Sequence, residues 1–113
     1  MITDSRAYGE AIADVLDTLC DPFDVIPADM FDNPGALLRL VDRLGEQDRQ
    51  NANPRQLVET VEEIDCIYRV TWANLRHPAD DADPEQVACA RYHVRTVLSL
   101  LARFVHVVEE VTE

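Results

Sequence analysis

An asparagine or aspartate directly precedes a proline at three places in this chain, and each pair opens a run of apolar residues. The pairs are Asn33-Pro34, Asn53-Pro54 and Asp83-Pro84. An Asn or Asp side chain just before a helix accepts hydrogen bonds from the unpaired amides of the first turn, and proline at the first helical position has no amide hydrogen to leave unpaired. The three pairs therefore predict helix starts at residues 34, 54 and 84.

The spacing of apolar residues gives these helices their lengths and adds one helix before them. Apolar positions recur every three or four residues over 4–20, 34–49, 54–76 and 84–111, which places them on one face of each helix. The connections between the last three helices are short, so these helices are expected to be antiparallel neighbours. Residues 1–113 are thus expected to form one all-α domain, a small antiparallel bundle of four helices with a long C-terminal helix.

The fourth predicted helix carries the widest apolar stripe. At about 1.5 Å per residue it reaches roughly 40 Å, and the first two helices are little more than half as long. A long helix beside shorter neighbours leaves apolar surface uncovered, so a homodimer through the third and fourth helices is one expectation. The alternative is that the C-terminal end of this helix, which carries Glu109, Glu110 and Glu113, simply frays.

The chain has 22 acidic residues against 10 basic ones, all of them arginine, for a formal net charge of −12. Two interpretations compete. A high-salt or arginine-biased proteome produces such a composition in every protein, whereas selection for a negative field steers one protein toward basic partners. Both argue against nucleic acid or an anionic membrane as a direct ligand, because each repels a negative surface.

The cysteines Cys20, Cys66 and Cys89 have unrelated spacings and form no Cys-x-x-Cys pair. An odd number of cysteines without a disulfide framework predicts free, mostly buried thiols in a reducing compartment. The first residues lack the basic-then-apolar order of a signal peptide, and Arg103 and His106 interrupt the longest apolar stretch. No membrane span is expected, and the expected location is the cytoplasm.

Acidic residues in the third predicted helix raise the question of a metal site. This helix contains Glu59, Glu62, Glu63 and Asp65, and the set includes one Glu-x-x-Glu and one Glu-x-x-Asp spacing, as in helical nucleotide pyrophosphohydrolases. In those enzymes acids on two facing helices bind magnesium, but here the fourth helix carries Arg91, Arg95 and Arg103. Charge pairing with arginines is therefore the preferred interpretation, and magnesium-dependent hydrolysis is the lesser alternative.

Other catalytic arrangements are also weak in this sequence. Cys89 and His93 are four residues apart, as a thiol nucleophile and its base could be on one helix, but cysteines inside an apolar helix are usually inert packing residues. The chain has neither a glycine-rich phosphate loop nor the Glu-x-x-His pair of a di-iron bundle. We therefore expect no catalytic residue, no metal and no cofactor, and the protein is not expected to be an enzyme.

The acidic residues are concentrated near the N-terminus, where residues 1–32 hold eight acids and one arginine. Glu10, Asp14, Asp17 and Asp21 follow one another at helical spacing along one line of the first predicted helix. Successive carboxylates are about 5–6 Å apart along the axis, similar to the phosphates of a nucleic-acid strand. This pattern favours a non-enzymatic binding protein that inhibits or regulates a basic, nucleic-acid-handling partner, in the style of phage-encoded inhibitors of CRISPR effectors and of restriction enzymes.

The line of acids has a plainer explanation as the solvated face of an amphipathic helix. The alternative function is then a structural or assembly role, in which the chain is a helical homodimer and its acidity reflects a halophilic or arginine-biased proteome.

Residues 21–33 break the helical pattern and mix apolar side chains with acids and prolines. Phe23 and Ile26 are expected to fold back as a lid over one end of the bundle, and Pro27 to open a single helical turn. Met30 and Phe31 are the better candidates for contact with a partner. The predicted partner-binding residues are Glu10, Asp14, Asp17, Asp21, Asp24, Met30 and Phe31.

Overall fold

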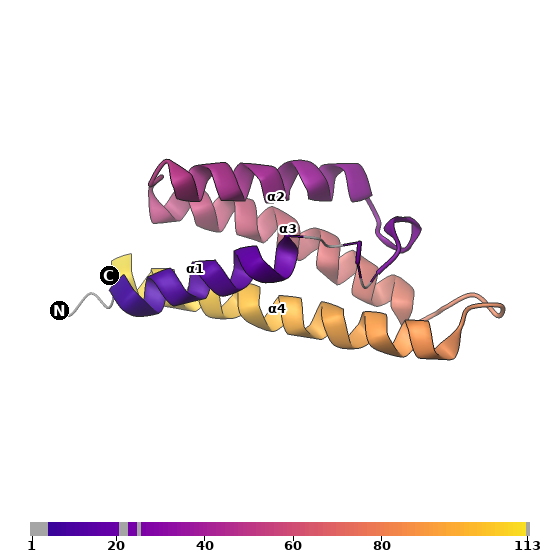
Figure 1. Cartoon of the computed structure of the whole chain (residues 1–113). Helices are drawn as coiled ribbons and strands as arrows, with labels where there is room; N and C mark the ends of the chain where they lie inside the picture. Colours follow the sequence, from indigo (N-terminus) through magenta and orange to yellow (C-terminus); the bar gives the residue numbers. More distant parts are fainter. Residues whose placement is uncertain (1–4, 21–22, 25, 113) are drawn as a thin grey trace.

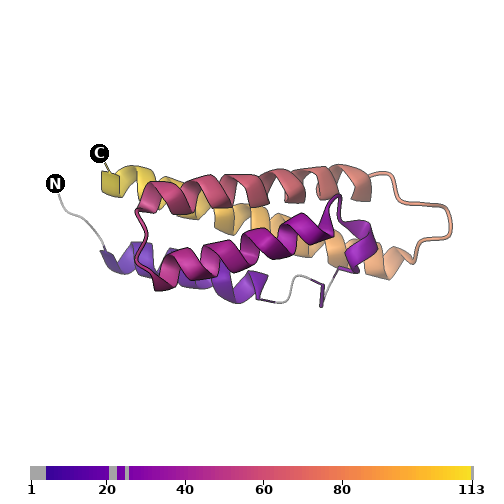
Figure 2. The same cartoon turned by 90° about the horizontal axis from the view of Figure 1, so that it is seen from above.

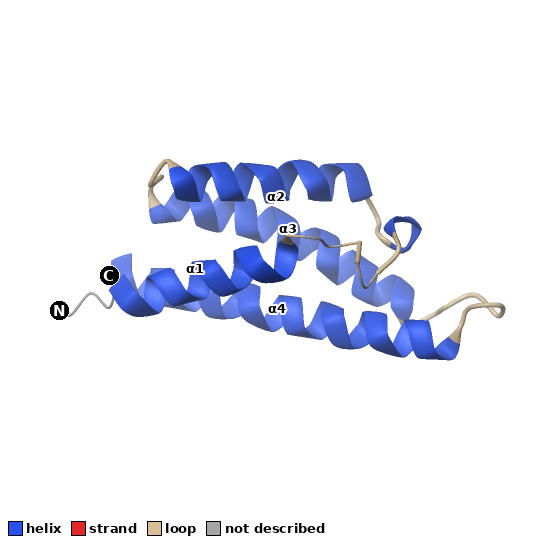
Figure 3. Cartoon of the chain, in the orientation of Figure 1, coloured by secondary structure: helices blue, strands red, loops and turns tan. Residues whose placement is uncertain are grey.

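The computed structural model describes residues 5–20, 23–24 and 26–112, and these form four α-helices and one short 3-10 turn (Figure 1). The elements are α1 (Ser5–Leu19), η1 (Ala28–Met30), α2 (Pro34–Arg49), α3 (Pro54–Leu75) and α4 (Pro84–Thr112). No strand occurs in this part of the chain (Figure 3). The all-α bundle is confirmed, and each helix begins and ends within one residue of its predicted position.

The Asx-Pro pairs cap their helices as predicted. In each case a side-chain oxygen of the Asx residue accepts a hydrogen bond from a backbone amide of the first turn. The acceptor and donor pairs are Asn33 with Ala36 at 3.2 Å, Asn53 with Arg55 at 2.9 Å, and Asp83 with Glu85 at 3.0 Å. A cap of this kind stabilises a helix by about 1 kcal/mol.

The two long helices α3 and α4 form the central pair of the bundle. α1 lies along α4 and α2 lies along α3, whereas α1 and α2 contact each other less (Figure 1, Figure 2). Successive helices run in opposite directions, so the start of α1 and the end of α4 lie at one end of the molecule. The turn from α3 to α4 lies at the other end.

The apolar stripe of α4 is covered by its neighbours. Its buried positions keep the predicted alternation of three and four residues: Val87, Ala90, Val94, Val97, Leu101, Phe104 and Val108. Leu98, Leu100, Val105 and Val107 widen the stripe, and these half-buried side chains pack against the same core. The width of the stripe is therefore accounted for inside one chain. Neither α4 nor any other described helix is long and apolar enough to cross a membrane.

The segment between α1 and α2 covers the part of the central pair that α1 does not reach. α1 ends at Leu19, about midway along α4 (Figure 1), and η1 packs on α3. Ile26 is fully buried, as predicted, and Phe23 is half-buried against the core. The predicted single helical turn is confirmed as well, since η1 begins directly after Pro27.

Polar contacts between helices reinforce the packing. The Arg91 guanidinium on α4 donates two hydrogen bonds, of 3.0 and 2.6 Å, to the Leu75 carbonyl at the end of α3. A cation at this position satisfies an unpaired carbonyl and the negative end of the helix dipole. The Arg91 side chain thus contacts the end of α3 rather than its flank.

Candidate partner-binding surface

The outward face of α1 carries a line of exposed carboxylates. Glu10, Asp14 and Asp17, called the acidic line below, are all exposed. Ile12 and Val15 on the opposite side of α1 are buried. The 10-to-17 spacing corresponds to two helical turns, or about 10 Å along the axis. The predicted line is therefore presented to solvent over the residues that the structure describes.

Asp14, in the middle of the acidic line, is paired within the molecule. Asp14 accepts a hydrogen bond of 3.0 Å from Arg103 on α4, with the two side chains 50% and 46% exposed. A pair this exposed contributes little to stability, but it partly neutralises Asp14. Arg103 thus faces an acid of α1. Asp17 has no ion pair or hydrogen bond with any other described residue through its side chain, so its charge is available to a partner.

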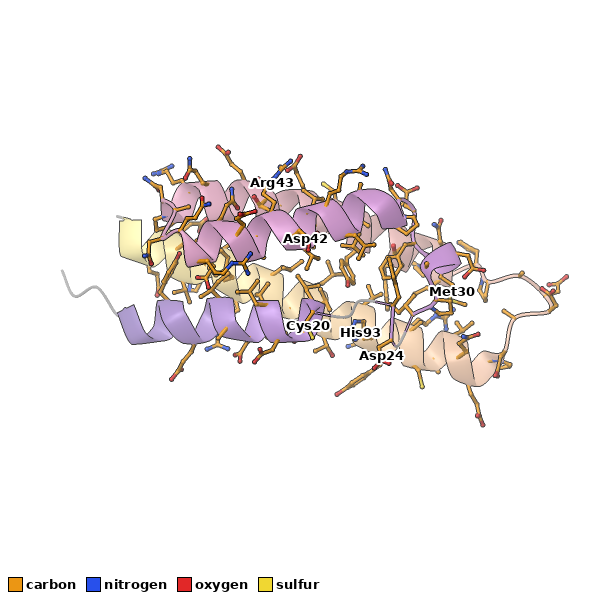
Figure 4. All side chains as sticks on the ribbon, turned by 45° about the horizontal axis from the view of Figure 1, so that its top comes forward. Cys20, Asp24, Met30, Asp42, Arg43 and His93 are labelled. Carbon is orange, nitrogen blue, oxygen red and sulfur yellow. The ribbon has the colours of Figure 1, made fainter. Side chains whose placement is uncertain are left out.

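The remaining predicted contact residues are placed differently from one another. Asp24 is exposed on the segment that leads from α1 to η1 (Figure 4). Asp21 lies outside the described residues. Met30 is half-buried at the end of η1.

Phe31 corrects the prediction of an exposed aromatic anchor. Its side chain is only 5% exposed. Its ring meets the Tyr68 ring edge-on at 5.6 Å and the Phe23 ring at 5.4 Å. The physical reason is the shortness of α1, which leaves Tyr68 on α3 to be covered by another apolar side chain. Phe31 is a core residue and cannot contact a partner without leaving the core.

A buried tyrosine and a half-buried histidine lie beside each other, and each has a buried polar atom without a hydrogen-bond partner among the described residues. Tyr68 is fully buried, and neither its hydroxyl nor Nε2 of His93 is hydrogen-bonded to any described residue. The two ring centroids are 6.5 Å apart. Burial raises the pKa of Tyr68 and lowers the pKa of His93, since both charged forms lose hydration. His93 therefore favours its neutral form in the folded protein.

The cysteines do not occupy the positions expected of them. All three were predicted to be mostly buried, and all three are exposed. No hydrogen bond joins Cys89 to His93 within the described part of the molecule. Each cysteine lies in or next to an apolar run, but the 100° turn per residue carries it past the buried face of its helix.

The α3 acids are spread over the surface. Glu59, Glu62 and Glu63 are exposed. Glu63 pairs with Arg43 of α2 at 3.2 Å, and Asp65 pairs with Arg69 one turn along α3 at 2.6 Å. Among the residues that the structure describes, no three His, Cys, Asp or Glu side chains come together as metal ligands would.

The geometry thus leaves one exposed surface that combines predicted contact residues: the acidic line together with Asp24. It contains acceptors for arginine and lysine, and residues 8–24 contain no basic residue. Comparison of the chain with protein-family models, with curated proteins and with solved structures gave no match.

Proposed function

We propose that this chain is a non-enzymatic binding protein that inhibits or regulates a basic, nucleic-acid-handling protein. The contact surface is the acidic line together with Asp24, and Met30 lies farther along the same segment. The observation that supports this proposal most directly is the position of three carboxylates on the solvent side of one helix, with its apolar side buried.

The mechanism is competition for a nucleic-acid groove. Carboxylates at helical spacing pair with arginine and lysine side chains that otherwise contact phosphates. Such pairs favour rapid association and weaken as salt screens the charges. The net charge of −12 adds a long-range attraction toward a positive groove. Nucleic acid and this protein then exclude each other from the partner.

The experiment that tests the proposal neutralises the acidic line. The variant Glu10→Gln, Asp14→Asn, Asp17→Asn removes three charges without adding bulk. A matched control, Asp42→Asn, Glu46→Gln, Glu59→Gln, removes three exposed charges from α2 and α3. Proteins captured from the source cells by the parent, variant and control at low and high salt are identified, and each purified candidate is then titrated directly.

The expected result is a basic protein that binds the parent and the control but does not bind the variant. Added nucleic acid should displace the parent from this protein, and high salt should weaken the complex. The variant is expected to keep its helicity, because loss of the exposed Asp14–Arg103 pair is a small perturbation. Far-UV circular dichroism checks this. Equal binding of variant and parent would remove the acidic line as the interface.

A second candidate function is assembly as a structural homodimer. The observation that favours it is Tyr92 on α4, an aromatic side chain that is 75% exposed. Sedimentation of the parent and of Tyr92→Ser over a range of concentrations tests this candidate. A dimer that dissociates in the variant supports assembly, and a parent that stays monomeric at high concentration excludes it.

A further inference from the structure

The end of the bundle opposite the start of α1 contains an apolar pocket of about 260 Å³. η1, the end of α3, the turn 77–83 and the start of α4 form its walls. Phe31, Leu75 and Val87 make a floor that is almost completely buried. Met30 and Pro78 are further apolar members of the lining, and the pocket is partly open to solvent.

The floor of this end pocket is held in place before any ligand arrives. Phe31 is fixed by the aromatic rings of Phe23 and Tyr68. Leu75 is fixed by the two hydrogen bonds from Arg91 to its carbonyl. A preformed pocket binds with less loss of conformational freedom than one that must be assembled.

The volume of the end pocket limits what can fill it. An apolar protein cavity of about 150 Å³ holds a benzene ring, while sites for drug-sized molecules begin at about 300 Å³. A single large apolar side chain, such as leucine, methionine or phenylalanine, matches the space between these limits. The small residues Ala79 and Ala82 at the lining leave room for it.

The charge around the end pocket is strongly negative. Asp29 belongs to the lining, and the exposed acids of the following turn and helix start are Asp80, Asp81, Asp83 and Glu85. Against them the stretch 76–86 contains one arginine, Arg76, and one histidine, His77. An occupant that carries positive charge beside its apolar group is therefore favoured.

The charge around the end pocket and the arrangement of the helices exclude two other occupants, a second copy of the chain and the terminal helix ends. A second copy of the chain would bring its own acids and a net charge of −12 to an acidic rim, which is repulsive. The end of α4 and the start of α1 lie at the opposite end of the bundle, so neither terminal element reaches the pocket (Figure 1).

We infer that the end pocket receives one large apolar side chain of a partner segment whose flanking residues are arginine or lysine, which pair with the acids around the pocket. The inference rests on the proposed function, because it supplies a binding motif for the same basic partner. It adds an apolar anchor, which gives a salt-resistant part to an otherwise electrostatic contact. Asp24 lies between the acidic line and this pocket in the chain (Figure 4), and Asp29 belongs to η1.

The two methionines of the chain provide a direct probe. Met30 lines the end pocket, and Met1 is the other methionine in the sequence. Protein with ¹³C-labelled methionine methyl groups is titrated with a blocked peptide of four arginines around a central leucine. The same peptide with alanine at its centre is the comparison. The Met30→Leu variant assigns the Met30 signal.

The leucine peptide is expected to shift the Met30 methyl signal in a saturable way and to bind roughly tenfold or more tightly than the alanine peptide. High salt should weaken both peptides and keep their ratio. Ala79→Phe, which fills the pocket from its rim, should remove the preference for leucine. Ala102→Phe, at an exposed position of α4 15 residues beyond Val87, adds the same side chain away from the pocket and should leave the preference intact.

Two results would overturn the inference. One is equal affinity for the leucine and alanine peptides with an unmoved Met30 signal, which means that the acids bind arginine without an anchor. The other is a leucine preference that survives Ala79→Phe, which places the anchor elsewhere. A failure of this experiment can be told apart from a failure of the proposed function. The short peptide tests the end pocket at Met30 and not the acidic line. Neutralising the acidic line, in turn, does not alter the end pocket.

Discussion

Replacing Tyr68 by phenylalanine is expected to make this protein more stable. The Tyr68 hydroxyl is fully buried and has no hydrogen-bond partner among the described residues. A buried polar group that gives up its water without finding a new partner costs about 1–3 kcal/mol. Tyr68→Phe removes this group and keeps the ring, so the edge-on contact with Phe31 at 5.6 Å is retained.

The expected gain is at the low end of that range, about 1 kcal/mol, because removal of the oxygen also leaves a small void. For a chain of 113 residues, this gain raises the melting temperature by about 4 °C. Urea unfolding followed by far-UV circular dichroism measures it, and the dependence on urea should keep its slope, since the surface exposed on unfolding barely changes.

Tyr92→Phe is the matched control for this measurement. Tyr92 is 75% exposed, so its hydroxyl is hydrated in both folded and unfolded protein, and its removal should leave the free energy of unfolding unchanged. A loss of stability of about 1 kcal/mol in Tyr68→Phe would refute the reasoning, because it would mean that the Tyr68 hydroxyl makes a hydrogen bond in the folded state.

Three further measurements test other parts of the structure. Burial lowers the pKa of His93 in the folded protein, so His93 is protonated more readily in the unfolded chain. The free energy of unfolding should therefore fall as the pH drops below the ordinary histidine pKa of about 6.5. His93→Gln should reduce this loss in urea titrations at successive pH values. Arg91→Gln should lower the free energy of unfolding by about 1–2 kcal/mol, since the Leu75 carbonyl loses a charged partner, while Arg95→Gln at an exposed position should have little effect. A thiol reagent should label all three cysteines in the folded protein as fast as in the unfolded chain, and protection of any one would contradict its exposure.

The helix starts could be predicted from the sequence because their cause is local. Asn33, Asn53 and Asp83 each bond an amide two or three residues further along the chain, so a short stretch of sequence contains both partners. The core positions of α4 follow from the same kind of information, since the period of a helix decides which residues share a face.

The positions that the sequence did not reveal depend on contacts between distant segments. Phe31 is buried because α1 ends before it can cover Tyr68, and neither residue indicates this alone. Asp14 and Arg103 are 89 residues apart in the chain, and only the packing of α1 along α4 brings them together. The end pocket likewise combines η1, α3 and α4. In the sequence, the acids around it could not be distinguished from the general negative charge of the chain.

The placement of the charges makes the two interpretations of the acidity separable. Within the described part of the chain, the buried core contains no acid, and its polar members are Thr60 and Thr71. Asp17 and Asp24, two exposed acids of the proposed contact surface, lie outside this core, and at low salt their repulsion opposes the folded state. Asp17→Asn with Asp24→Asn should leave stability unchanged or raise it at low salt.

Molar salt then distinguishes the interpretations. If acidity is an adaptation of the whole proteome to salt, the parent should gain more stability than the Asp17→Asn, Asp24→Asn variant as salt is raised above about 1 M. If the acids serve binding, salt should act on both proteins alike in this range, because the repulsion between the charges is already screened at about 1 M. In that case the parent keeps carboxylates that its fold does not need, as expected of residues retained for contact with a partner. A larger gain for the parent in molar salt would instead favour the proteome-wide explanation and count against the proposed binding surface.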